Sequence, residues 1–377
     1  MKKKIIFNVP KVVGSEFRNI NKLSNFKHYS GNGYFTNKCS SWLVKNIKCK
    51  EALMVHSCTA ALEICAILLN IKAGDEIIMP SYTFVSTANA FTQRGGKVVF
   101  VDINKKTLNI DENLIEKSIT KKTKAIVVVH YAGISCEMEK ICKIAKKHNI
   151  ILIEDAAQAL LSKYKNKPLG SFGDLATISF HETKNIHCGE GGALLINNNN
   201  FIKRAKIIRD KGTNRDQFNK NLVKKYTWVD IGSSYALSEI NCAFLYSQFE
   251  KAKKIIKKRM TLWKLYFSLF SKNNQTFQLP FVPKGVNHNA HIFFVILRKN
   301  NRNKTLKLLN QKKINAIFHY VPLHSSPFGK KYCKKVSQLT NTNFISQNLI
   351  RFPLHNEIKK NDIKYIRDTF FKCLKLK

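Results

Sequence analysis

The chain has 377 residues, of which 44% are hydrophobic and 24% charged, a composition typical of a folded globular protein and unlike that of a disordered one. Its formal net charge is +41, and its lysine pairs are spread along the whole sequence. Because no arginine-rich block, zinc-finger spacing or RNA-binding aromatic signature accompanies them, we favour a solvated lysine coat over a nucleic-acid site. The charge would still attract an anionic small substrate at long range.

Ten cysteines are scattered without a Cys-x-x-Cys pair or a Cys/His cluster at metal-ligand spacing. This pattern predicts reduced thiols, no metal site and a cytoplasmic location. The apolar residues after Lys4 are interrupted by Asn8 and Pro10, which argues against a signal peptide. No run approaches the length of a membrane span, so membrane insertion is not expected.

Short apolar runs alternate with helical stretches from about residue 51 to about residue 197, which predicts an α/β layer architecture. Several runs are continuously apolar, as in strands covered by helices on both faces, so we expect a largely parallel central sheet. The expected strands are 77–79, 98–101, 125–129, 150–153, 176–180 and 193–196. The expected helices between them are 59–69, 137–148 and 201–209, the last preceded by a turn at 197–200.

The alternation of short apolar runs and helical stretches does not continue after about residue 251, where a long basic amphipathic stretch runs to residue 270. A strand at 292–297 and a helix at 302–311 are expected beyond it. We therefore predict a large domain of residues 1–250, which includes an N-terminal segment, and a small C-terminal α/β domain of residues 251–377.

Two segments offer ligand contacts near the starts of expected helices. Small residues from Ser57 onward open the helix at 59–69, and such a start is suited to a phosphate held by the Thr59 hydroxyl and the Thr59 and Ala60 amides. Capping of the helix by Ser57 or Thr59 explains the same residues without a ligand. Further on, Tyr82 and Phe84 follow a strand, where either could stack on a flat cofactor ring or simply belong to the core.

Asp155 and Gln158 follow the strand expected at 150–153. Ligands bind at the carboxyl ends of strands in open α/β sheets, so Asp155 is well placed to meet a cofactor. An ionised carboxylate there would stabilise a protonated pyridine nitrogen, and Gln158 could hydrogen-bond a phenolic oxygen of the same ring. The alternative is that Asp155 only caps the following helix.

Lys184 lies on a short polar turn after the strand that ends near Ser179, and three glycines follow closely. A lysine on such a turn, downstream of a buried aspartate, is the arrangement that carries pyridoxal phosphate as a Schiff base. It needs burial and neighbours that depress its pKa. The spacing alone does not exclude an ordinary surface lysine.

These features together resemble the DegT/DnrJ/EryC1/StrS family of pyridoxal-phosphate-dependent sugar aminotransferases, over nearly the whole chain. The resemblance runs from residues 10–14 to residues 319–324. Five runs are most similar to the subgroup that forms dTDP-4-amino-4,6-dideoxygalactose. They are residues 80–91, 179–185, 211–215, 225–228 and 231–235.

The resemblance implies the α/β architecture of fold-type-I aminotransferases and a homodimer with active sites at the subunit interface. Lys184 would hold the cofactor covalently and later shuttle a proton between the substrate carbon and the cofactor carbon. Asp155 would pair with the pyridine nitrogen, Gln158 would sit beside the ring oxygen, and Phe84 would stack on the ring.

The resemblance also implies a phosphate site formed by Thr59, Ala60 and Ser179. Many family members have an asparagine that reaches this phosphate across the dimer, and Ser234 stands at the corresponding place here. A serine hydroxyl can still donate a hydrogen bond but has a shorter reach.

The activity implied is transfer of the amino group of glutamate to a nucleotide-linked 4-keto-6-deoxy sugar for cell-surface polysaccharide synthesis. The expected acceptor is dTDP-4-dehydro-6-deoxy-D-glucose, giving dTDP-4-amino-4,6-dideoxy-D-galactose. His319, Tyr320 and His324 are candidates for sugar or nucleotide contacts, and a structural role is an equal alternative for each histidine.

Three other functions compete with this one. The acceptor could be another nucleotide-linked keto sugar. A sugar dehydratase on the same scaffold is disfavoured, because the resemblance predicts a histidine in place of Lys184 for that activity. A non-enzymatic regulator that binds pyridoxal phosphate or nucleic acid would be expected to carry a DNA-binding module, and the sequence shows none.

Overall fold

The computed structural model describes residues 4–271, 275–299, 301–335 and 338–376. Its central sheet is mixed and has eight strands in the order β1-β9-β8-β5-β4-β2-β3-β13. Every neighbouring pair is parallel except the two made by β9. The strands are β1 (Glu51–Val55), β2 (Glu76–Pro80), β3 (Lys97–Val101), β4 (Thr123–Val129), β5 (Ile151–Asp155), β8 (Leu175–Ser179), β9 (Gly192–Ile196) and β13 (Lys334–Lys335). The predicted largely parallel sheet is confirmed, and β1 and β13 are strands that the sequence did not predict.

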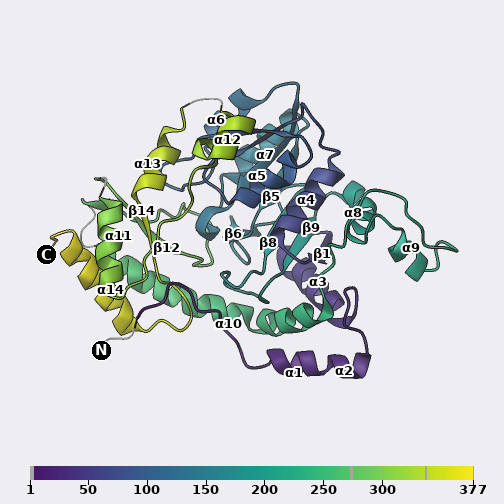
Figure 1. Cartoon of the computed structure of the whole chain (residues 1–377), viewed down its shortest axis with the longest axis horizontal. Coiled ribbons are helices and arrows are strands. Elements are labelled where there is room, and N and C mark those ends of the chain that lie inside the picture. Colours follow the sequence, from purple (N-terminus) through teal and green to yellow (C-terminus); the bar gives the residue numbers. More distant parts are fainter. Residues whose placement is uncertain (1–3, 272–274, 300, 336–337, 377) are drawn as a thin grey trace.

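Both faces of this sheet are covered, which explains the continuously apolar strands (Figure 1). In β4, Val127 packs on one side with α4 (Cys58–Leu68), and Val128 packs on the other with α7 (Met138–Lys147). Helices α5 (Val85–Thr92) and α8 (Ile202–Arg209) join α4, while α3 (Tyr34–Ile47) shares the face of α7. The expected helices at 59–69, 137–148 and 201–209 are therefore confirmed to within a residue or so.

A smaller unit follows in the C-terminal part of the chain. Its sheet has the order β10-β12-β14, formed by β10 (Phe277–Gln278), β12 (Phe293–Leu297) and β14 (Leu349–Phe352). These strands form a separate core with α14 (Lys360–Cys373) and the end of α10 (Glu239–Phe270). Helix α11 (Arg302–Gln311) packs against α14 and has the bounds that the sequence predicts.

Helix α10 begins twelve residues before the predicted stretch at 251–270 (251 − 239 = 12). Its first turns face α1 (Glu16–Asn21), where Gln248 donates to Glu16 at 2.6 Å and Asn19 donates to Ser247 at 2.7 Å. These buried polar contacts interrupt the apolar pattern that marks the later turns. The predicted boundary between residues 250 and 251 therefore falls inside one continuous helix, and the exact division into domains stays a prediction.

The remaining elements are short. They are α2 (Leu23–Phe26), α6 (Glu112–Ile115), α9 (Arg215–Asn219), α12 (Pro327–Tyr332), α13 (Thr340–Asn348), β6 (Lys163–Tyr164), β7 (Lys167–Pro168) and β11 (Val286–Asn287). Helix α9 lies on an arm that projects from the body beyond α8 (Figure 1). Among the helices of the described residues, none combines the length and the apolar character that crossing a membrane requires.

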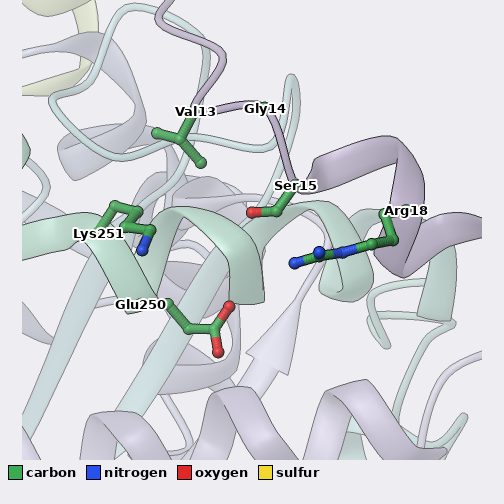
Figure 2. Close-up of a pocket in the computed structure, with 6 residues that line it drawn as sticks. All are labelled: Val13, Gly14, Ser15, Arg18, Glu250 and Lys251. Carbon is green, nitrogen blue, oxygen red and sulfur yellow. The ribbon is translucent and has the colours of Figure 1, made fainter.

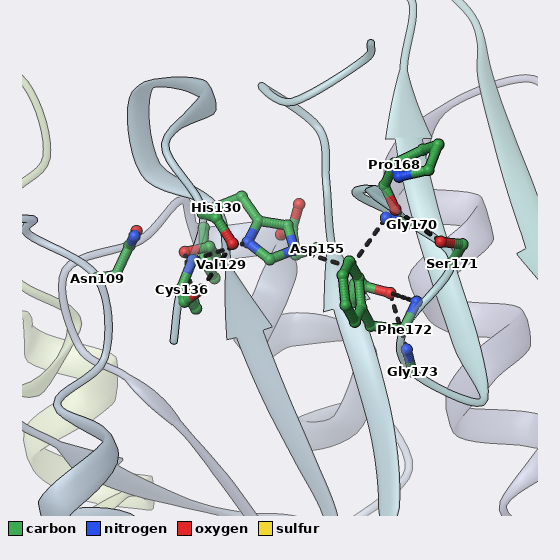
Figure 3. Close-up of polar contacts among 12 residues, drawn as sticks. Asn109, Val129, His130, Cys136, Asp155, Pro168, Gly170, Ser171, Phe172 and Gly173 are labelled. Atoms are coloured by element: carbon green, nitrogen blue, oxygen red, sulfur yellow. Dashed lines mark hydrogen bonds and ion pairs between the residues drawn. The ribbon is translucent and has the colours of Figure 1, made fainter. Parts of the chain in front are cut away.

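A fully buried carboxylate, that of Glu154, fixes the carboxyl end of β5. It accepts backbone hydrogen bonds from Gly170, Phe172 and Gly173 at 2.7–2.8 Å, all from one turn (Figure 3). It also lies 2.9 Å from Nε2 of His130, at the end of β4. Because Nδ1 of His130 accepts from the Cys136 backbone N–H at 3.3 Å, the ring hydrogen lies on Nε2 and is donated to Glu154. Burial raises the pKa of Glu154, but these hydrogen bonds outweigh it and hold the pKa below its usual value.

We predict that Glu154→Gln destabilises the protein by about 3 kcal/mol at pH 7, because an amide cannot accept all four hydrogen bonds and turns its own donors toward them. The folded-state pKa of Glu154 is depressed. Its contribution is therefore fully present above the unfolded value of about 4.3 and is lost as the pH falls through the folded value. Urea unfolding of both proteins across this range measures the difference.

The exposed Glu250→Gln provides the matched control, with no change expected at any pH. A penalty for Glu154→Gln that stayed constant below pH 4 would contradict the role given to the carboxylate.

Candidate functional site

A cavity of about 680 Å³ opens at the carboxyl ends of β4, β5 and β8, where the large sheet meets the smaller unit. Eight residues singled out from the sequence line it together. They are Thr59, Phe84, Asp155, Gln158, Ser179, Lys184, His319 and Tyr320. The folded chain thus brings into one cavity residues that are up to 261 positions apart (320 − 59 = 261).

Lys184 reaches the cavity from the turn after β8, where its backbone N–H donates to the carbonyl of His181 at 2.9 Å. The side chain is half-buried. Burial lowers the pKa of the Lys184 amine, and the nearby Arg351 charge lowers it further, while Cys58 and Asp155 act in the opposite direction. A lowered pKa is what a nucleophilic lysine requires, because the protonated amine does not attack.

Asp155 is the last residue of β5 and is buried at the back of the cavity. Its carboxylate accepts from the Thr87 hydroxyl at 2.8 Å and from the Ala157 backbone N–H at 3.1 Å. Burial raises the pKa of Asp155, and these hydrogen bonds and the charge of Lys184 reduce the rise. Such a carboxylate favours a positively charged partner in the cavity.

Gln158 is held in one orientation. Its Oε1 accepts from the Ala132 backbone N–H at 2.7 Å, and its Nε2 donates to the Tyr320 hydroxyl at 2.6 Å. The Tyr320 ring stacks on His319, with ring centroids 3.7 Å apart, and His319 Nδ1 lies 2.6 Å from the Tyr131 hydroxyl. Burial lowers the pKa of His319 well below its ordinary value, so this ring is neutral. These side chains form a rigid polar wall.

The amino-terminal end of α4 forms another part of the wall, through Ser57, Cys58 and Thr59. Ser57 is the N-cap, and its hydroxyl accepts the Ala60 backbone N–H at 3.0 Å. Thr59 donates its hydroxyl to Ser86 at 2.8 Å. The capping role considered from the sequence is therefore confirmed for Ser57, and it occupies the Ala60 amide.

Phe84 precedes α5 and lies on the rim of the cavity, with 57% of its surface exposed. Its ring centroid is 6.5 Å from that of Tyr320. An exposed aromatic face beside a polar wall is suited to covering a planar ligand. Ser179, at the end of β8, lines the cavity near the α4 terminus.

Three of the predicted residues lie outside the lining of this cavity. Ala60 is buried in α4, and its amide is used as described above. Ser234 is exposed on the segment after α9, where it forms a β-bridge with Asp210. His324 contacts Ser81 instead, with Nδ1 2.7 Å from the hydroxyl.

The sequence did not single out several residues that line the cavity, foremost Arg351, His291 and Phe7. Arg351 comes from β14, His291 from the segment before β12, and Phe7 from the N-terminal segment. For Arg351 one signal was available, because it is the single charged residue in the run Leu349–Phe352.

A second hollow, of about 660 Å³, lies between the start of α1 and the middle of α10 and is lined by Val13, Gly14, Ser15, Arg18, Glu250 and Lys251 (Figure 2). It lacks the aromatic faces and the buried acid that the first cavity has. Within the described residues, no group of three or more His, Cys, Asp or Glu side chains is placed to hold a metal ion.

The model of the DegT/DnrJ/EryC1/StrS aminotransferase family matches residues 12–371 of the chain. The chain is 34% identical, over 341 residues and 88% of each protein, to the UDP-4-amino-4,6-dideoxy-N-acetyl-beta-L-altrosamine transaminase of Campylobacter jejuni.

Solved structures share the fold. PseC of Helicobacter pylori, an aminotransferase involved in the biosynthesis of pseudoaminic acid, superimposes with a TM-score of 0.90 at 27% identity, covering 99% of this chain and 100% of PseC. Spr1654 of Streptococcus pneumoniae, solved in PLP and PMP forms, has a TM-score of 0.90 for the PLP form at 24% identity, covering 99% of both chains. The predicted fold-type-I architecture with a smaller C-terminal unit is confirmed.

Proposed function

We propose that the protein transfers the amino group of glutamate to a nucleotide-linked keto sugar in this cavity, because the chain belongs to the DegT/DnrJ/EryC1/StrS aminotransferase family. The chain is a pyridoxal-phosphate-dependent sugar aminotransferase. The observation that carries the residue assignment is that the Lys184 amine, with its lowered pKa, and the buried carboxylate of Asp155 line one cavity.

The residues present suit pyridoxal phosphate. Its protonated ring nitrogen is stabilised by a carboxylate, which Asp155 provides, and its aldehyde reacts with an amine, which Lys184 provides. The Thr59 hydroxyl and Ser179 lie beside the α4 terminus, where an anion is stabilised by the helix dipole. Gln158 and Phe84 supply a polar edge and an aromatic face for the ring.

When bound, pyridoxal phosphate supplies an electron sink for the electrons left on a substrate carbon after it loses a proton. Asp155 would keep a proton on the ring nitrogen, because its carboxylate stabilises the positive charge there. The Lys184 Nζ would take the proton from the substrate carbon and deliver it to the cofactor carbon on the other side of the transferred nitrogen. The wall of Gln158 and Tyr320 would exclude water from this transfer.

We predict that the purified protein, after borohydride reduction and proteolysis, carries its pyridoxyl label on the peptide containing Lys184. Lys184→Ala should lower kcat by at least about 10³-fold, because both the covalent hold and the proton shuttle are lost. The matched control is the exposed Lys203→Ala, which should keep normal turnover. Labelling of another lysine, or near-normal turnover by Lys184→Ala, would refute the assignment.

The preferred acceptor is dTDP-4-dehydro-6-deoxy-D-glucose. This choice rests on residues 80–91 and 179–185, which resemble the subgroup that forms dTDP-4-amino-4,6-dideoxygalactose. The Campylobacter jejuni relative favours a second candidate, because its name specifies a UDP-linked, N-acetylated product. His319 and Tyr320 line the cavity and remain candidates for sugar contacts, whereas His324 contacts Ser81 and lies outside the lining.

We predict that the dTDP-linked 4-keto sugar gives a higher kcat/KM than its UDP-linked N-acetylated counterpart, at equal glutamate concentration. Coupled detection of 2-oxoglutarate, with the aminated product identified by NMR, measures both. A preference of tenfold or more for the UDP-linked sugar, about 1.4 kcal/mol in transition-state binding, would move the assignment to the second candidate.

A homodimer with shared active sites is also part of the proposal. The arm around α9 carries apolar side chains that solvent surrounds in the single chain, with Leu222 71% and Trp228 81% exposed. Exposed apolar clusters of this kind mark protein contacts. Ser234 follows the same arm and is exposed, and we infer that in the dimer its hydroxyl serves the cavity of the neighbouring copy.

We predict a dimer in sedimentation experiments, and a shift toward monomer for the double variant Leu222→Lys/Trp228→Lys. Phe281→Lys, at an exposed apolar residue of the smaller unit, is the control and should leave the dimer intact. Ser234→Ala should weaken cofactor retention by about tenfold or more, as expected for the loss of one hydrogen bond to a charged group. A monomeric wild-type protein would contradict the shared site.

A further inference from the structure

A third hollow, of about 350 Å³, lies between the N-terminal segment, α10 and the segment that precedes α14. Four lysines line it, one from the N-terminal segment and three from α10: Lys11, Lys251, Lys254 and Lys258. Asn356 and three aliphatic side chains complete the lining. The hollow shares no residue with the lining of the Lys184 cavity, so it is a separate site.

Helix α10 carries exposed lysines on more than one side, and those of one side line the hollow. Lys251, Lys254 and Lys258 follow each other at intervals of three and four residues, which places them on the same side of the helix. Lys253 and Lys257 are also exposed but lie outside the lining. Position on the helix therefore decides which lysines converge on the hollow and which face solvent.

Acidic side chains are scarce around the hollow. From residue 251 to residue 356 the chain has 21 Lys and Arg residues and no Asp or Glu. Among the described residues, the one ion pair at the hollow joins Lys11 to Glu357, with Nζ and Oε1 2.7 Å apart. Like charges that line one small hollow repel one another, and a bound anion would relieve this repulsion.

The amide of Asn356 is a polar group of the hollow that lacks a partner. The residue is 4% exposed, and within the described part of the chain its buried Oδ1 has no hydrogen-bond partner. A buried polar atom without a partner is costly, and native structures rarely leave one unsatisfied. Rotating the amide by half a turn exchanges Oδ1 and Nδ2, so the same end of the side chain can offer N–H donors to an anion.

We propose that the hollow binds a small dissolved anion that carries a diphosphate group, held by the four lysines and by the Asn356 amide. A volume of about 350 Å³ exceeds what one phosphate group fills, and several ammonium groups can balance several negative charges. Lysine binds phosphate as a compact point charge with three rotatable donors, so separate lysines can converge on neighbouring phosphate groups. The inference goes beyond the proposed function, because it concerns residues that the amino-group transfer does not use.

The N-terminal strap, residues 5–13, connects this hollow to the rest of the molecule. The Lys11 carbonyl accepts from Nε2 of Gln248 on α10 at 2.7 Å and from Nε2 of His187 at 3.1 Å. Four residues earlier in the strap, Phe7 lines the Lys184 cavity. A diphosphate group bound by Lys11 and the α10 lysines therefore ties the strap to α10.

Calorimetry on the cofactor-loaded protein at low ionic strength measures the Kd of inorganic diphosphate, the probe for this site. Lys254→Gln/Lys258→Gln should raise this Kd by about tenfold or more, because two charged contacts are lost. Lys253→Gln/Lys257→Gln is the matched control, since it removes the same charge from the same turns of α10, and should change the Kd by less than about twofold. Asn356→Ala should raise the Kd by about tenfold, as expected for the loss of a hydrogen bond to a charged group.

Hydrogen exchange gives a readout at the strap itself. Inorganic diphosphate should slow amide exchange in residues 5–13, and Lys254→Gln/Lys258→Gln should abolish this protection. The nucleotide dTDP separates two sources of the diphosphate group. Protection by inorganic diphosphate and dTDP alike supports a site for any diphosphate group, and protection by inorganic diphosphate alone supports a site for the free ion.

Equal weakening by the two lysine pairs would assign the binding to the lysine coat as a whole and overturn the inference. A wild-type protein that does not bind inorganic diphosphate, or binding that neither lysine pair changes, would overturn it too. None of these results depends on the pyridoxyl label at Lys184, so the inference and the proposed function are tested independently.

Discussion

The carboxylate of Glu154 is the interaction on which the arrangement of the cavity depends. It gathers three backbone N–H groups of one turn and the His130 ring around the end of β5. Asp155 is the next residue and turns to the cavity, and Gln158 follows three residues later. A buried carboxylate with four donors has little freedom to move. The strand end is thus rigid without any ligand, and the groups it presents are oriented in advance.

Charged side chains of both signs line the cavity where chemistry is proposed. Lys184 and Arg351 both line it, and burial lowers the pKa of each. Asp155 lies with them, and burial raises its pKa. A cofactor with an anionic phosphate and a cationic ring nitrogen, followed by an anionic donor, would pair with both the cationic and the anionic side chains of the cavity. The net charge of +41 adds long-range attraction for such anions, which salt would weaken.

Local patterns predicted much of this structure, because buried strands and their polar ends are local features. The continuous apolar runs identified six strands of the central sheet, and residues at strand ends such as Asp155 and Lys184 proved to share a cavity. Features set by distant contacts were not predicted. The start of α10 was missed because its first turns carry polar residues that face α1. Arg351 was missed because it reaches the cavity only when β14 pairs with the segment carrying Ile317.

The central claim is that an amino group is transferred in the Lys184 cavity through two separate half-reactions. The most direct measurement is to mix the cofactor-loaded protein with glutamate in the absence of any keto sugar and to count the 2-oxoglutarate released. The account predicts one equivalent per chain, after which release stops until a nucleotide-linked keto sugar is added. Absence of 2-oxoglutarate, or continuous release without an acceptor, would contradict it.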